Sequence, residues 1–248
     1  MTTGGVVAAC AAGGIVGGPL LELVAARTVR HQPAPAGDVQ TAPAPVPTAP
    51  APAPVRTIPP ATATPSAARV AVAAVSGGLL VLTAVRLGAV PQLAAYCALW
   101  LGLVTLSVVD LRVGLVPRMI LYPTLAVTGA GLVAASAADG RWHDLAGAAI
   151  GGAVAFCVFA AVWWLYPKGL GFGDVRLAGV CGMALGWLGF TEVYVGFLAA
   201  FVLGLVFGLG NLVVRGSTRF PFAPALAAGA AVGVLWGGYL GNLWLHHG

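Results

Sequence analysis

The chain has 248 residues, of which 59% are hydrophobic and 8% are charged, and its formal net charge is +5. So few polar side chains cannot cover a water-soluble globule, so the composition excludes that class and indicates a membrane protein. The positive residues are neither clustered nor interleaved with aromatic residues, which argues against a nucleic-acid partner.

Eight apolar stretches have about the length that a helix needs to cross a bilayer. Such a span takes about 20 largely apolar residues. The sixth stretch is short, but it counts as a span because residues 175–214 can hold two helices joined by a tight turn. The predicted fold class is an all-α polytopic membrane protein, a bundle of about eight transmembrane helices at roughly 6–26, 70–88, 93–110, 117–137, 145–165, 175–189, 193–214 and 222–243.

The positions of Lys and Arg predict that the N-terminus lies outside. Cytoplasmic loops of membrane proteins carry an excess of these residues. With an outside N-terminus only Arg86 and Arg141 fall outside, and the first span is interpreted as retained because its cations follow it. The inner loops then hold Arg27, Arg30, Arg56, Arg69, Arg112, Arg118, Lys168, Arg176, Arg215 and Arg219.

A proline-rich segment divides the chain into three parts. Residues 31–68 hold eleven of the eighteen prolines, and such a segment cannot form enough backbone hydrogen bonds to fold. We therefore predict an N-terminal transmembrane helix in residues 1–30, a disordered cytoplasmic linker in 31–68 and a catalytic transmembrane domain in 69–248.

The four cysteines do not indicate a metal site or a disulfide framework. Cys10, Cys97, Cys157 and Cys181 are too far apart for any CxxC pair, and each lies within an apolar span. The four histidines are scattered over the linker, an outer loop and the tail. No metal and no cofactor is therefore expected.

Two aspartates remain once the other acidic residues are assigned to loops, the linker and one helix end. Asp110 closes the third span in VVDLRVGLVP, and Asp174 opens the sixth in GFGDVRLAG. A carboxylate at a helix start stabilises that helix by about 1 kcal/mol, so capping alone can explain Asp174. In a last turn it faces the negative end of the helix dipole, so stability does not explain Asp110.

The predicted topology places both carboxylates at cytoplasmic helix ends, where they can be adjacent. Two such groups share a proton, and the pair can activate water against a carbonyl, as in aspartic proteases. The helix directions predict that Asp174 is the more ionised member and Asp110 the more easily protonated one. Gly171 and Gly173 have no side chains, so a substrate strand could lie close to the backbone beside Asp174.

Three stretches resemble blocks of the type IV prepilin peptidases, which are GxGD aspartic membrane proteases. GFGDVRLAG resembles their GxGDxKL block, with Arg176 where Lys is usual. VVDLRVGLVPRMILYP is similar to the block around the first catalytic Asp, with Val116, Pro117 and Arg118 in place of Ile-Pro-Asn. RFPFAPALAAG resembles the late Pro-Phe-Gly-Pro block, with Ala223 in the Gly position. The resemblance covers about residues 69–248.

The resemblance implies an enzyme that removes the short basic leader of prepilins or pseudopilins, usually after a Gly. Its active site would lie on the cytoplasmic face of the inner membrane, with Asp110 and Asp174 as the catalytic pair. Lys168, Arg112 and Arg176 would attract an acidic residue of the substrate or the phosphates of membrane lipids. 

Bifunctional members of that family carry a zinc-binding region with two CxxC pairs and N-methyltransferase activity between their first two spans. Here the proline-rich segment occupies that place, and no cysteine lies between Cys10 and Cys97. We therefore expect a peptidase without the methyltransferase activity.

Two alternatives stay open from the residues alone. One is an ion or proton-coupled transporter or channel that uses the two aspartates, although few polar residues mark a path across the bilayer. The other is a GxGD protease of the presenilin or signal-peptide-peptidase type, but Val109 precedes Asp110 where that group has Tyr.

Overall fold

The computed structural model describes residues 66–88, 90–167, 169–215 and 221–246. The predicted span at 6–26 and nearly all of the predicted linker lie outside the described residues. The first described helix begins at Ser66, three residues before the predicted start of the catalytic domain.

The described part of the chain contains helices with short connections and no strands, which confirms the predicted all-α fold class. Six of its helices are long and apolar enough to cross a membrane, whereas α6 is shorter at 17 residues. The count of eight spans and the outside N-terminus stay predictions. The helices are α2 (Ser66–Leu87), α3 (Leu93–Val113), α4 (Arg118–Asp139), α5 (Trp142–Leu165), α6 (Phe172–Leu188), α7 (Phe190–Arg215) and α8 (Ala223–His246).

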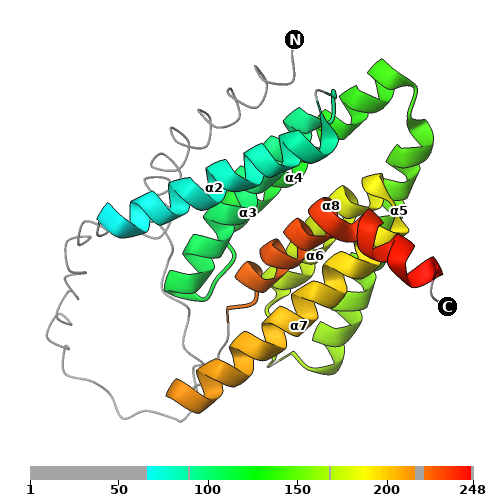
Figure 1. Cartoon of the computed structure of the whole chain (residues 1–248). Helices are drawn as coiled ribbons and strands as arrows, with labels where there is room; N and C mark the ends of the chain where they lie inside the picture. Colours follow the sequence, from blue (N-terminus) through cyan, green and yellow to red (C-terminus); the bar gives the residue numbers. More distant parts are fainter. Residues whose placement is uncertain (1–65, 89, 168, 216–220, 247–248) are drawn as a thin grey trace, which may run out of the picture.

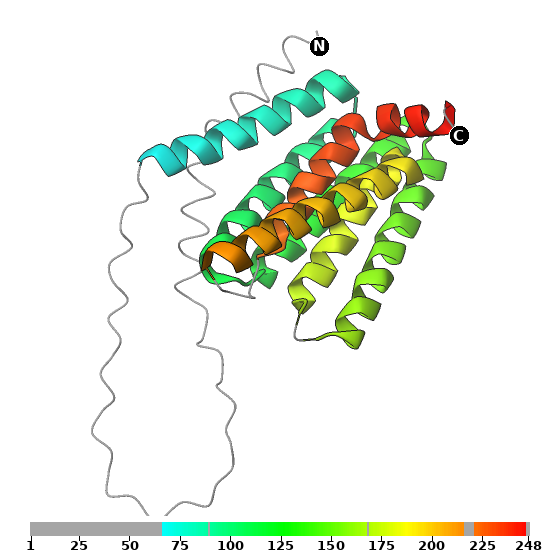
Figure 2. The ribbon, with the colours of Figure 1, turned by 60° about the horizontal axis from the view of Figure 1, so that its bottom comes forward.

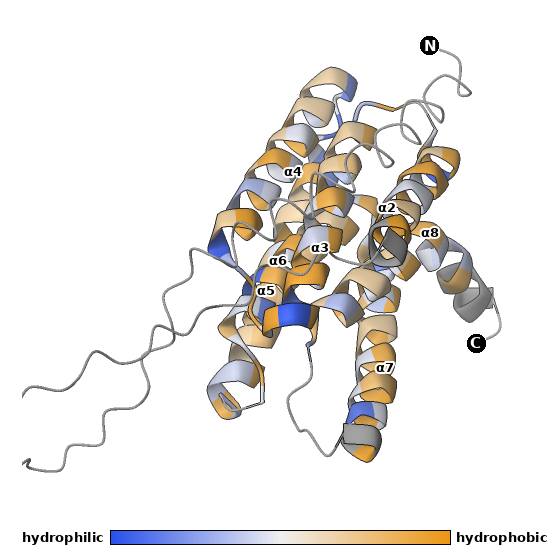
Figure 3. Cartoon of the chain, turned by 90° about the vertical axis from the view of Figure 1, so that its left-hand side faces the viewer, coloured by the Kyte–Doolittle hydropathy of each residue, from blue (hydrophilic) through white to orange (hydrophobic). Residues whose placement is uncertain are grey.

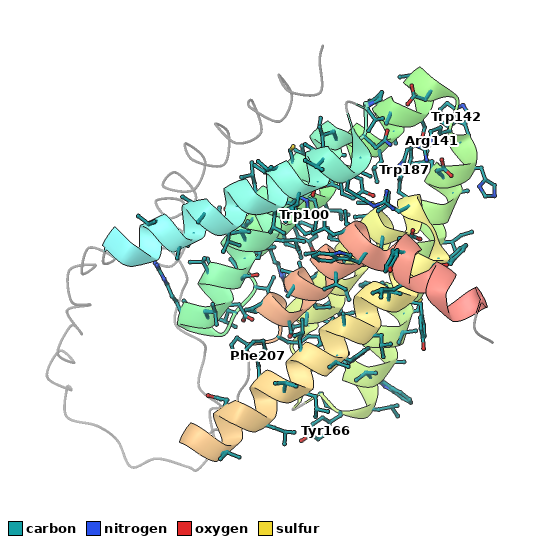
Figure 4. All side chains as sticks on the ribbon, viewed as in Figure 1. Trp100, Arg141, Trp142, Tyr166, Trp187 and Phe207 are labelled. Carbon is teal, nitrogen blue, oxygen red and sulfur yellow. The ribbon has the colours of Figure 1, made fainter. Side chains whose placement is uncertain are left out.

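Short connections make consecutive helices antiparallel, so alternate connections lie at the same end of the bundle (Figure 1). The α3–α4, α5–α6 and α7–α8 connections share one end, which we call the site end. Tyr166 marks this end in Figure 4, while Arg141, Trp142 and Trp187 lie at the other. Helix α2 lies along one face of the bundle (Figure 2).

The outer surface of the bundle is apolar, as expected for helices that face lipid. Large side chains such as Trp164 and Val213 are 77% and 83% exposed. Hydrophilic residues concentrate near helix ends (Figure 3). The described helices therefore have the surface of a membrane bundle.

Hydrogen bonds between buried side chains and neighbouring helices fix the centre of the bundle. The Tyr96 hydroxyl on α3 donates to the carbonyl oxygen of Ala184 on α6 at 2.6 Å. The Trp100 indole Nε1 on α3 donates to Thr83 Oγ1 on α2 at 2.8 Å. Because an unpaired polar group in hydrocarbon is costly, these bonds hold α6 and α2 in register with α3.

Glycines bring α5 and α6 into backbone contact, because small residues let helices approach closely. A Cβ placed on Gly151 would lie 2.6 Å from the carbonyl oxygen of Gly182 and 2.9 Å from Cα of Gly186. A Cβ on Gly152 would lie 3.2 Å from the carbonyl oxygen of Gly179. Ten of the 17 residues of α6 are buried, so the contact fixes the helix that carries Asp174 at its start.

We expect Gly151→Ala to lower the midpoint of thermal unfolding in detergent, because the new methyl group has no room between α5 and α6. Overpacking of this kind costs about 1–3 kcal/mol. Gly78→Ala in α2 is the matched control, since a Cβ there would meet no atom within 4 Å. Equal midpoints for the two variants would contradict the close contact.

Candidate active site

Asp110 lies in the last turn of α3 and is 5% exposed. Gly114 ends the helix in the left-handed conformation, with φ of 66°, and its N–H donates to the carbonyl oxygen of Asp110. A residue with a side chain would be strained at that φ. The helix therefore ends at Val113, three residues after Asp110, which places the carboxyl group at the site end.

The carboxylate of Asp110 contacts the start of α8. Its Oδ2 accepts the backbone N–H of Ala223, the first residue of α8, at 3.0 Å. The first N–H groups of a helix have no partner within that helix, and its N-terminus carries partial positive charge. The carboxylate of Asp110 is unfavourable at the end of α3 but favourable at the start of α8. The interpretation that stability does not explain Asp110 is therefore incomplete.

Asp174 lies in the first turn of α6, and its side chain is mostly buried at the site end. Its backbone N–H donates to the carbonyl oxygen of Gly171 at 3.0 Å. Its Oδ1 is buried and has no hydrogen-bond partner among the described residues. An acceptor without a donor inside a folded protein is costly, so this oxygen is available to a water molecule or a substrate.

The two carboxyl groups are close enough to influence each other. Asp174 lies outside the six candidate spans. Burial, and to a lesser extent the negative charge of Asp110, raise the pKa of Asp174 to about 7. The helix directions predicted that Asp174 is the more ionised member; burial raises its pKa despite its place at a helix start, and the order within the pair stays a prediction.

Gly171 and Gly173, the glycines of the GxGD sequence, are both packed against neighbours. A Cβ on Gly173 would lie 2.7 Å from Cβ of Val116, in the connection between α3 and α4. A Cβ on Gly171 would lie 3.2 Å from Oδ2 of Asp174 itself. These contacts give both glycines a role in placing Asp174, in addition to the predicted role beside a substrate strand.

The three cations predicted near the site differ in how far the structure describes them and in their exposure. Arg176 is half-buried, with its guanidinium 4.4 Å from the ring centre of Phe172 and 5.9 Å from that of Tyr122. Arg112 is exposed in the last turn of α3. Lys168 lies outside the described residues.

The sequence reasoning did not include Ala223 and Val116 among the site residues. Both lie within stretches that carried the family resemblance, so the signal was available for each. Neither could be assigned from its side chain, because Ala223 acts through its backbone N–H and Val116 acts by filling space next to Gly173. Within the described ranges, no group of His, Cys, Asp and Glu could hold a metal ion.

Comparison with known proteins agrees with this geometry. Residues 96–209 match the model of the Type IV leader peptidase family. A "Prepilin leader peptidase/N-methyltransferase" of Burkholderia pseudomallei is 32% identical over 185 residues, 70% of this chain and 57% of the relative. Relatives with the same name from Pseudomonas putida and Aeromonas salmonicida are 31% and 30% identical, over 67% and 58% of this chain and 59% and 50% of their own lengths. No solved structure matches.

Two acidic groups at one end of a helical membrane bundle are the kind of pair that aspartic proteases use. Through residues 96–209, the chain belongs to the type IV leader peptidase family. It spans about half to three fifths of the length of the curated relatives it matches.

Proposed function

We propose that the chain is an aspartic endopeptidase that removes the leader peptide of prepilin-like or pseudopilin-like proteins. The observation that carries the proposal is the approach of Asp110 and Asp174 at one end of the bundle, on helices 64 residues apart in sequence. The names of the relatives supply the substrate class. These relatives are longer than the part of them that this chain matches, so their activity is a proposal for this chain.

The two carboxyl groups supply what peptide hydrolysis requires. The ionised group takes a proton from a water molecule, whose oxygen bonds to the carbonyl carbon of the scissile peptide. The protonated group gives its proton to the carbonyl oxygen as the tetrahedral intermediate forms. When the C–N bond breaks, the leaving nitrogen takes the proton that the first carboxyl group removed from water, and a hydroxyl of the intermediate returns a proton to the second. The products are a carboxylic acid and an amine, and the pair again holds one proton.

Positive residues near the site support a cytoplasmic active site in the inner membrane. Arg112, Arg118 and Arg176 lie at or near the site end, whereas Arg86 and Arg141 lie at the opposite end. An excess of Lys and Arg at one end of the spans is typical of their cytoplasmic end. Arg112 and Arg176, together with Lys168 as predicted from the sequence, would attract acidic residues or lipid phosphates, and Gly171 and Gly173 would border the substrate backbone.

The direct test is to incubate the purified chain with a full-length prepilin in detergent and to follow the substrate by mass spectrometry. We expect loss of the leader at a single peptide bond. The same spectra test methylation, because with added S-adenosylmethionine the new N-terminus is expected to stay unmethylated. An intact substrate would count against the peptidase, and a product heavier by one methyl group would contradict the absence of methyl transfer.

We expect cleavage to fall as the pH rises through about 7. The mechanism needs one proton on the pair, and the raised pKa of Asp174 means that this proton is held below about pH 7 and lost above it. The initial rate should be measured from pH 5.5 to 9 with the unfolding midpoint recorded in the same buffers. A flat rate across this range, with the fold intact, would be inconsistent with a proton on Asp174.

A further inference from the structure

A groove of about 400 Å³ runs between α4, α5 and α6 beside the site. Its lining is almost entirely apolar: Leu125 from α4, Ala149, Ala153 and Phe156 from α5, and Met183 from α6 are typical. Helices α4 and α5 are joined at the end opposite the site and diverge from there (Figure 1). Several lining side chains are exposed on the outer surface, so the groove opens toward lipid.

One cation, Arg176, belongs to the lining of this groove. It lies two residues after Asp174 in α6, so it marks the end of the groove nearest to the site. Its guanidinium rests against the rings of Phe172 and Tyr122. Among the described residues it forms no ion pair with a carboxylate, although its side chain is half-buried.

A half-buried guanidinium on aromatic rings leaves its N–H donors for an anion. Arg binds phosphate through two parallel hydrogen bonds and loses less hydration than Lys on partial burial. The apolar walls suit a hydrocarbon chain, and the depth near a helix end is that of the lipid headgroups. A molecule with a phosphate at one end and an acyl chain at the other satisfies both parts of the groove.

We propose that this groove binds an anionic phospholipid, with its phosphate on Arg176 and one acyl chain between α4 and α5. A zwitterionic lipid fits less well, because its own cation competes with Arg176 for the phosphate. The lipid would lie next to the start of α6, at the level of Asp174 along the helix but on a different face of it. This binding site is separate from the peptide chemistry and does not depend on the proposed cleavage.

The proposal can be tested on the full chain in detergent by native mass spectrometry with phosphatidylglycerol. We expect Arg176→Gln to bind this lipid about fivefold more weakly, with partial recovery in Arg176→Lys. Arg118→Gln is the control, because Arg118 is an exposed cation at the same end of the bundle but outside the groove. Phosphatidylcholine and inorganic phosphate should show little dependence on Arg176.

A second pair of variants tests the acyl chain. Ala153 is exposed and lines the groove, so Ala153→Trp should fill it and reduce retention of phosphatidylglycerol. Val154→Trp, on the next residue of α5 and outside the lining, should leave retention of phosphatidylglycerol unchanged.

Three results would overturn the proposal. The first is equal retention of phosphatidylglycerol in Arg176→Gln and wild type, and the second is an equal loss of retention in Arg118→Gln. The third is displacement of the lipid by a prepilin peptide with an acidic residue, which would make the groove a substrate site.

Discussion

Asp110→Asn and Asp174→Asn, each made alone, are expected to slow leader removal by at least about 10²-fold. Each change removes a group that must hold or release a proton, and nearly keeps the shape of the side chain. In Asp110→Asn the amide oxygen can still accept the N–H of Ala223, so the contact between α3 and α8 is kept. In Asp174→Asn a neutral side chain replaces a group whose charge is disfavoured by burial, so the fold is expected to survive.

Initial rates on a full-length prepilin should be compared with those of Asp139→Asn, which changes an exposed Asp at the opposite end of the bundle. This control is expected to cleave at the wild-type rate. Unfolding midpoints measured on all three variants separate lost chemistry from lost structure. Full cleavage by either site variant would remove that residue from the mechanism and with it the shared-proton pair.

Ala223→Pro is expected to reduce cleavage by about tenfold to a hundredfold, because proline has no N–H to donate to Asp110. A hydrogen bond to a charged group contributes about 1.5–3 kcal/mol. Proline is otherwise tolerated at the first position of a helix, and Ala223 is the first residue of α8. The change therefore acts mainly on the carboxylate of Asp110 and on its orientation toward Asp174.

Ala223→Gly provides the matched comparison, since it keeps the N–H and removes only the methyl group. It also restores the residue that the family resemblance places there. We expect its cleavage rate to stay within a few-fold of wild type, with the pH profile unchanged. If both variants lost activity equally, the buried methyl group of Ala223 would be responsible instead of its N–H.

The relation between sequence and site is clearest at the two aspartates. Both were predicted as a pair, because ionisable groups in an apolar chain are costly and therefore few. Their surroundings could not be predicted in the same way. The partner of Asp110 is a backbone N–H 113 residues away, and a backbone group leaves no mark of its own in a sequence. The protonation order was predicted from helix direction alone, which leaves out burial; burial depends on every neighbouring helix and raises the pKa of Asp174.

The amino-acid sequence by itself determined that this is a helical membrane bundle and which two carboxylates to examine. These properties follow from composition, length and charge, which are local and need no partner. Only the tertiary structure decided that the first N–H of α8 bonds to Asp110, that Val116 fills the space next to Gly173, and that Arg176 lines a groove. Such contacts depend on how closely helices approach one another, and in lipid that distance is set by packing and hydrogen bonds between distant residues.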